Sequence, residues 1–199
     1  MRSNICKIEK GTRDLEAILK ESERVAEYNS LTEKQTLQLR LLCEELDGML
    51  PNIIDDFGGD FWIDFEDGVC KVNAAIKIPK FNAEKKEDLI SVAMNKKNAA
   101  AVGVVGKIRN AIENFFLQDD SVIVYNPPHA SFYVTTGFSE GVDYSYLWSL
   151  KDYRSTVKQE EQTEEWDELE KSVIASVADD IIVGIKGNTA DIIIVKKFA

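Results

Sequence analysis

The sequence contains few of the residues from which metal sites and nucleophilic sites are usually built. Its 199 residues include one histidine, His129, and three cysteines, Cys6, Cys43 and Cys70. A single histidine excludes multi-histidine metal sites and argues against a Ser-His-Asp triad. No two cysteines stand at C-x-x-C spacing, which argues against structural zinc and dithiol chemistry. We therefore assign no metal ligand and interpret the cysteines as reduced, structural thiols.

Long apolar runs and an excess of positive charge are also missing. No apolar stretch approaches the roughly 18–20 residues that a membrane span needs, and the first residues lack the apolar segment of a secretory signal. These absences predict a cytoplasmic protein with no membrane partner. The formal net charge of −11 argues against nucleic acid as a partner, because neutralising phosphates requires a basic surface.

The charge is unevenly distributed along the chain. Residues 71–109 hold nine Lys or Arg against three acids, a net charge of +6, so the remainder carries −17. A local excess of this size indicates either a site for a small phosphorylated ligand or an acidic partner, or lysines on a solvated helix face. The sequence leaves both interpretations open.

Apolar spacing and turn signals predict the first half of the chain as strand, two helices and a hairpin. We expect a strand over 4–8, a helix from Thr12 as N-cap, and a second helix that starts at Thr32. Pro51 should kink or end this second helix near residue 50, because proline cannot donate the i→i−4 hydrogen bond. Asp67-Gly68 predicts a two-residue hairpin turn between strands near 61–65 and 69–78.

The second half is less regular until its end. Helical patterns cover 83–94 and 105–116, residues 118–145 are weakly patterned, and 146–162 is predicted as a polar helix. A helix over 169–181 then precedes two strands, within 181–198, that meet at the turn Gly187-Asn188. At this length one domain is expected. The order of elements predicts an α+β, two-layer sandwich, with helices on one face of a mixed, mostly antiparallel sheet.

The adjacent acids Glu44 and Glu45 can be placed by helical geometry at 100° per residue. With Leu39 at 0°, the apolar residues of this helix fall between about 280° and 40°. Glu44 lies near 140°, opposite the apolar stripe, and Glu45 near 240°, at its border beside Met49. Only Glu45 is therefore positioned to face a cleft between helix and sheet.

A glycine-rich segment, Gly103-Val-Val-Gly106-Lys107, precedes the helix predicted over 105–116. It lacks the four-residue spacer and the Ser or Thr after lysine that define a Walker motif. Its glycines and helix-start amides can nevertheless approach an anion. The alternative is that small residues here allow close helix packing.

The order of elements resembles the histidine-kinase-like (GHKL) ATPase superfamily, and most closely the small anti-sigma-factor serine kinases. The resemblance rests on NICKI, DLEAILKESERVAEYNSL, LTEKQTLQLRLLCEELDGML, the FWIDF-DG-VCKVNAAI hairpin and the ending LEKSVIASVADDI to IIIVKKF. It covers roughly residues 4–78 and 166–198 and implies a GHKL-type sandwich as one domain. Residues 118–160 have no counterpart and are predicted as an insertion.

The resemblance implies ATP with Mg²⁺ as cofactor and a regulatory role. Glu45 matches the acid that orients water, whereas Met49 stands where the family keeps its magnesium-binding asparagine. AAIKIPKFN replaces the family's Asp-x-Gly-x-Gly pattern, which reads adenine. The residues assigned to nucleotide binding are Asn52, Lys96, Lys97, Asn98, Gly103, Gly106 and Lys107.

Two functions remain open at this stage. The first is a divergent, ATPase-like regulatory protein that binds nucleotide through a degenerate active site. Phosphoryl transfer is less expected than nucleotide binding, because methionine offers Mg²⁺ no oxygen ligand. The second is a non-catalytic, anti-sigma-like interaction module that has lost nucleotide binding and serves a regulatory protein partner. The acidic remainder of the chain and the 118–160 segment favour the second.

Overall fold

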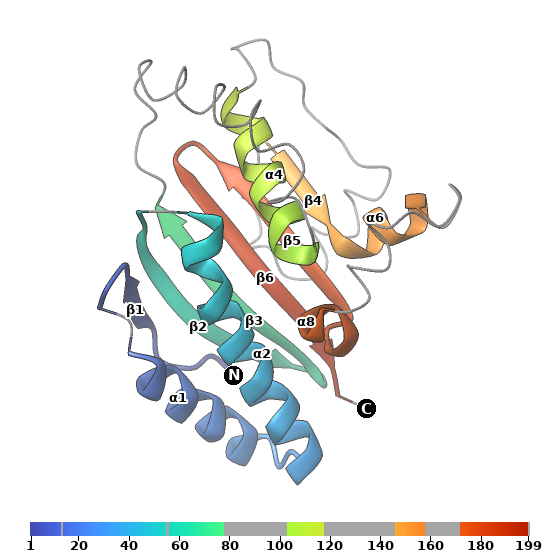
Figure 1. Cartoon of the computed structure of the whole chain (residues 1–199). Coiled ribbons are helices and arrows are strands. Elements are labelled where there is room, and N and C mark those ends of the chain that lie inside the picture. The colour runs from blue at the N-terminus through green and yellow to red at the C-terminus, as the bar shows by residue number, and fades with distance from the viewer. Residues whose placement is uncertain (13, 55, 78–102, 118–145, 158–171, 199) are drawn as a thin grey trace.

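The chain forms one antiparallel sheet with helices packed on it. The computed structural model (Figure 1) describes residues 1–12, 14–54, 56–77, 103–117, 146–157 and 172–198. The elements in order are β1 (Cys6–Glu9), α1 (Leu15–Tyr28), α2 (Glu33–Ile53), β2 (Gly58–Glu66), β3 (Val69–Lys77), α4 (Gly103–Leu117), β4 (Tyr146–Ser149), α6 (Leu150–Val157), α8 (Val173–Val177), β5 (Asp180–Lys186) and β6 (Thr189–Lys197).

The six strands lie in the order β1-β2-β3-β6-β5-β4, and each neighbouring pair is antiparallel. The β3–β6 pair joins the N-terminal hairpin to the C-terminal hairpin in the middle of the sheet. The α+β class predicted from the sequence is confirmed, and the sheet, predicted as mixed and mostly antiparallel, is antiparallel at every strand pair of the described residues. The pairing explains why α2 and α4, far apart in sequence, cover neighbouring parts of the sheet (Figure 1).

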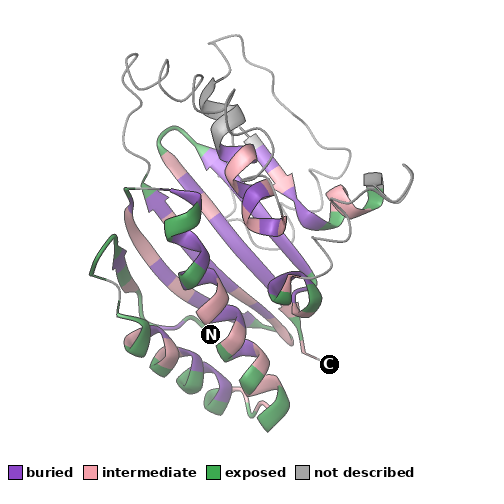
Figure 2. Cartoon of the chain, viewed as in Figure 1, coloured by how far each residue is buried: buried purple, intermediate pink, exposed green. Residues whose placement is uncertain are grey.

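The main core lies between the sheet and the helices. Alternate residues of each strand point into it, because side chains in a strand alternate between the two faces. Figure 2 shows the buried positions running along the strands beneath the helices. The cluster draws on strands and helices alike, with fully buried members that include Ile63, Val72, Ile194, Ile18, Leu42 and Ile108.

A second, smaller apolar cluster occupies the opposite face of the sheet. It consists of Leu147, Ile182, Ile193 and Val195, with Val69 packed against it. The four members of the cluster are at most 9 % exposed, and Val69 is half-buried. β5 and β6 therefore bury apolar residues on both faces, which explains their nearly continuous apolar sequences.

Both hairpin turns predicted from the sequence are present. Asp67 and Gly68 have φ values of 49° and 75°, the positive-φ pair that a type I′ turn requires. Gly187, at φ 56°, turns β5 into β6. Both turns depend on local sequence, which is why they were predictable.

The helix starts and ends differ in part from the predictions. α2 starts after Thr32, as predicted, and Thr32 forms a capping box with Gln35. The prediction for Pro51 was a kink or an end of the helix near residue 50; α2 continues through Pro51 to Ile53, so the helix does not end there, and the kink stays a prediction. The ring lies in the last turn, and the helical bond from the Ile54 N–H to the Leu50 carbonyl, 3.0 Å, still forms beyond it.

The N-cap of the first helix was also misplaced. Asp14, not Thr12, accepts a hydrogen bond from the amide of Ala17 at 2.9 Å, while the amide of Thr12 closes a turn onto Glu9. Aspartate and threonine are both good N-caps, so the local sequence offered two starts two residues apart.

The polar helix predicted over 146–162 is partly wrong. Residues 146–149 form β4, the edge strand paired with β5, and only the following residues are helical, as α6. Of the helix predicted over 169–181, the described residues are helical only as the short α8; its predicted end is wrong, because the helix ends at Val177 and residues 180–181 belong to β5. Predictions for 83–94 and 118–145 lie outside the described residues, and the 118–160 insertion stays a prediction. None of the helices described here is long and apolar enough to cross a membrane.

Candidate functional site

The two adjacent acids of α2 have different surroundings. Glu44 accepts a hydrogen bond from Nε of Arg40 at 3.1 Å, and Arg40 also reaches Glu23 on α1. Glu44 therefore belongs to the side of α2 that faces α1. Glu45 is half-buried, and its position 100° further round the helix turns it away from α1. Both glutamates are half-buried, and the orientation of Glu45 toward a cleft stays a prediction.

The position four residues after Glu45 contributes to packing. Met49 is 4 % exposed and belongs to the main core. A buried thioether supplies no oxygen ligand to a hard cation such as Mg²⁺. Met49 therefore acts as a core residue at the point where the resemblance places a metal-binding asparagine.

Asn52 lies in the last turn of α2 and is exposed. Its side-chain amide donates to the backbone carbonyl of Gly48 at 3.3 Å, within its own helix. In this conformation Asn52 contacts α2 itself and satisfies a carbonyl near Pro51.

The sequence analysis did not single out Asp47, a buried carboxylate of α2 with 4 % exposure. At 100° per residue it lies near 80°, at the edge of the apolar stripe and close to the side of Arg40. This angle is the feature of the sequence that could have indicated the burial of Asp47. An acid at the edge of the apolar stripe of a helix becomes buried when a neighbouring helix covers that edge. α1 packs against α2.

The glycine-rich segment forms the start of α4. Gly103 opens the helix with φ 74°, a value that favours glycine. Gly106 is buried, and Val104 and Ile108 are at most 1 % exposed. α4 packs against α2 and β5. The amides of the first turn leave the helix with a partial positive charge at this end.

Lys107 contacts an aromatic ring that the sequence gave no reason to choose. Its Nζ lies 5.1 Å from the ring centroid of Tyr153 on α6, within the distance of a cation–π interaction. Tyr153 in turn lies beside Trp148 of β4, with ring centroids 6.3 Å apart. Tyr153 belongs to a segment that the sequence predicts only as a polar helix. It lies far from Lys107 in the sequence, so only tertiary packing brings the two side chains together.

The structure therefore brings some of the predicted site residues onto neighbouring elements. Glu45 is on α2, and Gly103, Gly106 and Lys107 are in the first turns of α4, which packs on α2. Asn52 is on α2 but bonded within it. Lys96, Lys97 and Asn98 lie outside the described residues. No group of three or more potential metal ligands occurs within the described parts of the chain.

Comparison with known proteins adds no relative from which a role could be transferred. No protein-family model, curated protein or solved structure matches this chain.

Proposed function

We propose that this chain is a regulatory protein of GHKL type that binds ATP beside α2 and α4. The observation that carries the proposal is the packing of α4, with Gly103, Gly106 and Lys107 at its start, against the helix that holds Glu45. The N-terminus of α4 thus belongs to a helix that packs against α2, on which Glu45 is half-buried, while Lys107 in its first turns lies over Tyr153 of α6.

The physical reason is the charge of the nucleotide. The unpaired amides at the start of a helix favour phosphate, and the lysine adds a point charge. The proposal also draws on the order of elements at the two ends of the chain, which is β1, α1, α2 and the β2–β3 hairpin at the start and α8, β5 and β6 at the end, with α4, β4 and α6 between them. These features support nucleotide binding without identifying the base.

Phosphoryl transfer is not part of the proposal. That reaction depends on a metal ion held in position against the phosphates, and Met49 contributes a buried methyl thioether at the position concerned. The protein would therefore signal by its nucleotide-bound state, with Mg·ATP as a ligand.

Thermal denaturation with Mg·ATP tests the proposal. A ligand at 100 times its dissociation constant stabilises the folded state by about 2.7 kcal/mol, which raises the melting temperature of a chain of this size by about 5–10 °C. Lys107→Ala should reduce this ligand-dependent rise. Lys20→Ala, at an exposed position of α1, should leave it unchanged.

Each variant is compared with its own ligand-free melting temperature, because Lys107→Ala also removes the contact with Tyr153. If ATP, ADP and GTP all leave the melting temperature of the wild-type protein unchanged, the proposed function is wrong.

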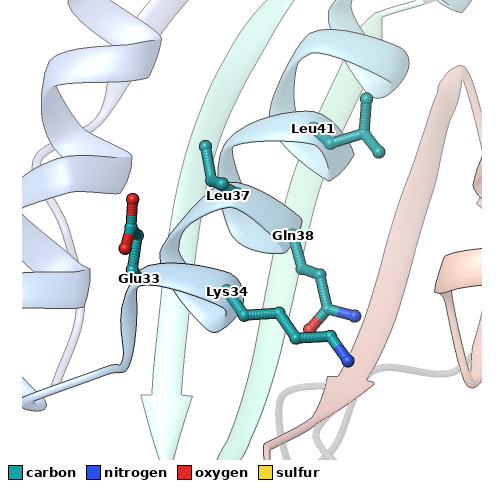
Figure 3. Close-up of a pocket in the computed structure, with 5 residues that line it drawn as sticks. All are labelled: Glu33, Lys34, Leu37, Gln38 and Leu41. Atoms are coloured by element: carbon teal, nitrogen blue, oxygen red, sulfur yellow. The ribbon is translucent and has the colours of Figure 1, made fainter.

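A protein-interaction module is the second candidate, and the outer face of α2 favours it. Leu37 is 60 % exposed there. Figure 3 shows it among the side chains that line an open depression of about 340 Å³, namely Glu33, Lys34, Leu37, Gln38 and Leu41. Together Leu37 and Leu41 give this hollow an apolar floor with polar edges, a combination that suits an apolar side chain of another protein.

Purification of the tagged protein from its native cell tests this second function. A stoichiometric partner should be recovered with the wild-type chain and lost with Leu37→Asp. Recovery of the chain alone, together with nucleotide binding, would count against the interaction module.

A further inference from the structure

A pocket lies on the opposite face of the sheet from α2 and α4. Its volume is about 400 Å³, within the range of about 300–1,000 Å³ that is common for small-molecule sites. Its apolar lining residues are Val69, Ile182 and Val195, all from the second apolar cluster. The rest of the lining is charged, and comes from β2, β3, β5, β6 and the start of α6.

Strand register places these residues on one face. Asp64 pairs with Lys71, Lys71 with Val195, and Val195 with Asp180, so one row crosses four strands. The neighbouring row, Ile63, Val72, Ile194 and Ile181, points into the main core. Because alternate residues of a strand face opposite sides, the pocket is separate from the proposed nucleotide site.

Two carboxylates of the pocket, the half-buried Asp64 and the exposed Asp179, already have hydrogen-bond donors. Asp64 accepts from Arg2, from the indole of Trp62 at 2.8 Å and from Asn73. Asp179 accepts from the amide of Lys197 at 2.6 Å. These groups are held by the protein and do not require a cationic ligand.

Asp180 is satisfied in the same way. It accepts from the hydroxyl of Ser149 and from the amides of Lys151 and Ile181, at 2.8–3.1 Å. Glu66 and Asp67 are exposed on the hairpin turn, at the rim of the pocket.

Two of the three lysines that line the pocket, Lys71 and Lys197, differ from the acids. Neither Lys71 nor Lys197 has a side-chain hydrogen bond or ion pair with any residue that the structure describes. Lys71 pairs with Val195 and Val69 with Lys197, so the two lysines are diagonal neighbours on adjacent strands. Diagonal positions lie about 7–8 Å apart, within reach of long side chains. Two ammonium groups can therefore meet at one anionic group.

Partial burial makes such an anion favourable. Desolvation is the main cause that lowers the pKa of Lys71, against the attraction of Asp64 and Glu66, which raises it. A bound anion would stabilise the charged ammonium that burial disfavours.

We infer that this pocket binds a small monoanion with an apolar body, such as a medium-chain carboxylate. Lys71 and Lys197 hold the anionic group, and Val69, Ile182 and Val195 contact the apolar part. The acids Glu66 and Asp67 at the rim disfavour ligands with several negative charges, such as nucleotides.

Titration of the ¹⁵N-labelled protein with octanoate, followed by amide chemical shifts, tests the inference. Octanoate should cause saturable shifts at Val69, Lys71, Ile182 and Val195. Octanol, which has the same tail without the charge, and octylammonium, which has the opposite charge, should bind at least tenfold more weakly. Lys71→Gln and Lys197→Gln should each weaken octanoate binding about tenfold, as expected for the loss of one charge-assisted contact.

Lys186→Gln is the matched control, because Lys186 is an exposed lysine on the same face of β5 and lies outside the pocket. It should leave octanoate binding unchanged, and Lys71→Arg should retain it. The inference is overturned if octanoate produces no saturable shift. It is also overturned if octanol binds equally well, or if Lys186→Gln weakens binding as much as Lys71→Gln. The outcome is independent of the nucleotide test, since the two sites lie on opposite faces.

Discussion

Replacing Asp180 should separate its role as a hydrogen-bond acceptor from its role as a charge. This aspartate is 7 % exposed, at the start of β5. It accepts hydrogen bonds from the amides of Lys151, 3.0 Å, and Ile181, 2.8 Å, and from Ser149. Ser149 also accepts from the amide of Asp152 at 3.2 Å. The aspartate thus fixes the first turn of α6 to β5.

Asp180→Ala removes the acceptor from two amides. Each buried group left without a partner costs about 1–3 kcal/mol, and entry of water at the adjoining pocket recovers part of this. We expect a loss of about 2–4 kcal/mol in the free energy of unfolding. Asp180→Asn keeps one carbonyl oxygen for the two amides and presents its NH₂ group to Ser149, so it should cost about 1 kcal/mol or less.

The pH dependence of stability provides a second, independent measure. Burial, the largest cause, and the nearby Asp152 raise the pKa of Asp180 above its ordinary value, although its hydrogen bonds lower it. Between the unfolded-state pKa, about 3.9, and this raised value, the folded protein binds more protons than the unfolded chain. The contribution of Asp180 to stability therefore falls as pH rises through this window.

The assay is urea denaturation followed by circular dichroism, at several pH values from about 4 upwards, since the transition starts near the unfolded-state pKa. The unfolding free energy of the wild type minus that of Asp180→Asn should decrease as pH rises, because asparagine does not titrate. Glu21 has the opposite behaviour: hydrogen bonds from Asn4 and Arg24 lower its pKa despite desolvation, which raises it. Both proteins contain Glu21, so its contribution cancels. A difference that increases with pH, or equal costs for Asp180→Ala and Asp180→Asn, would refute the reasoning.

Two further predictions concern backbone packing and thiol burial. Gly59→Ala should destabilise the protein by about 1–3 kcal/mol, because a Cβ atom at this position would overlap the carbonyl oxygen of Ala75. In Gly58→Ala the added Cβ atom meets only an ordinary contact with Glu9, so this variant should cost less. Equal urea midpoints for the two variants would contradict the prediction. Burial raises the pKa of Cys70 to about 12 and that of Cys43 well above its ordinary value. Iodoacetamide should therefore alkylate the half-buried Cys6 first in the native protein, as measured by mass spectrometry of tryptic peptides. Faster alkylation of Cys70 than of Cys6 would contradict this prediction.

The features of the fold that the sequence alone determined are those with local causes. Asp67-Gly68 and Gly187-Asn188 each specify a turn through backbone conformation, and Thr32 specifies a helix start through its own side chain. The separation of Glu44 from Glu45 also follows from helical geometry within one segment. In each case the residues involved are neighbours in the chain, so no knowledge of packing was needed.

The features that only tertiary structure decided depend on residues distant in sequence. Residues 146–149 are a strand because β5 offers them an edge, although their own pattern favoured a helix. The contact of Lys107 with Tyr153, the burial of Asp47 and the diagonal pair Lys71 and Lys197 all require elements that meet only after folding. Hydrogen bonding between strands and burial between layers are non-local, and they therefore override local preference where the two disagree.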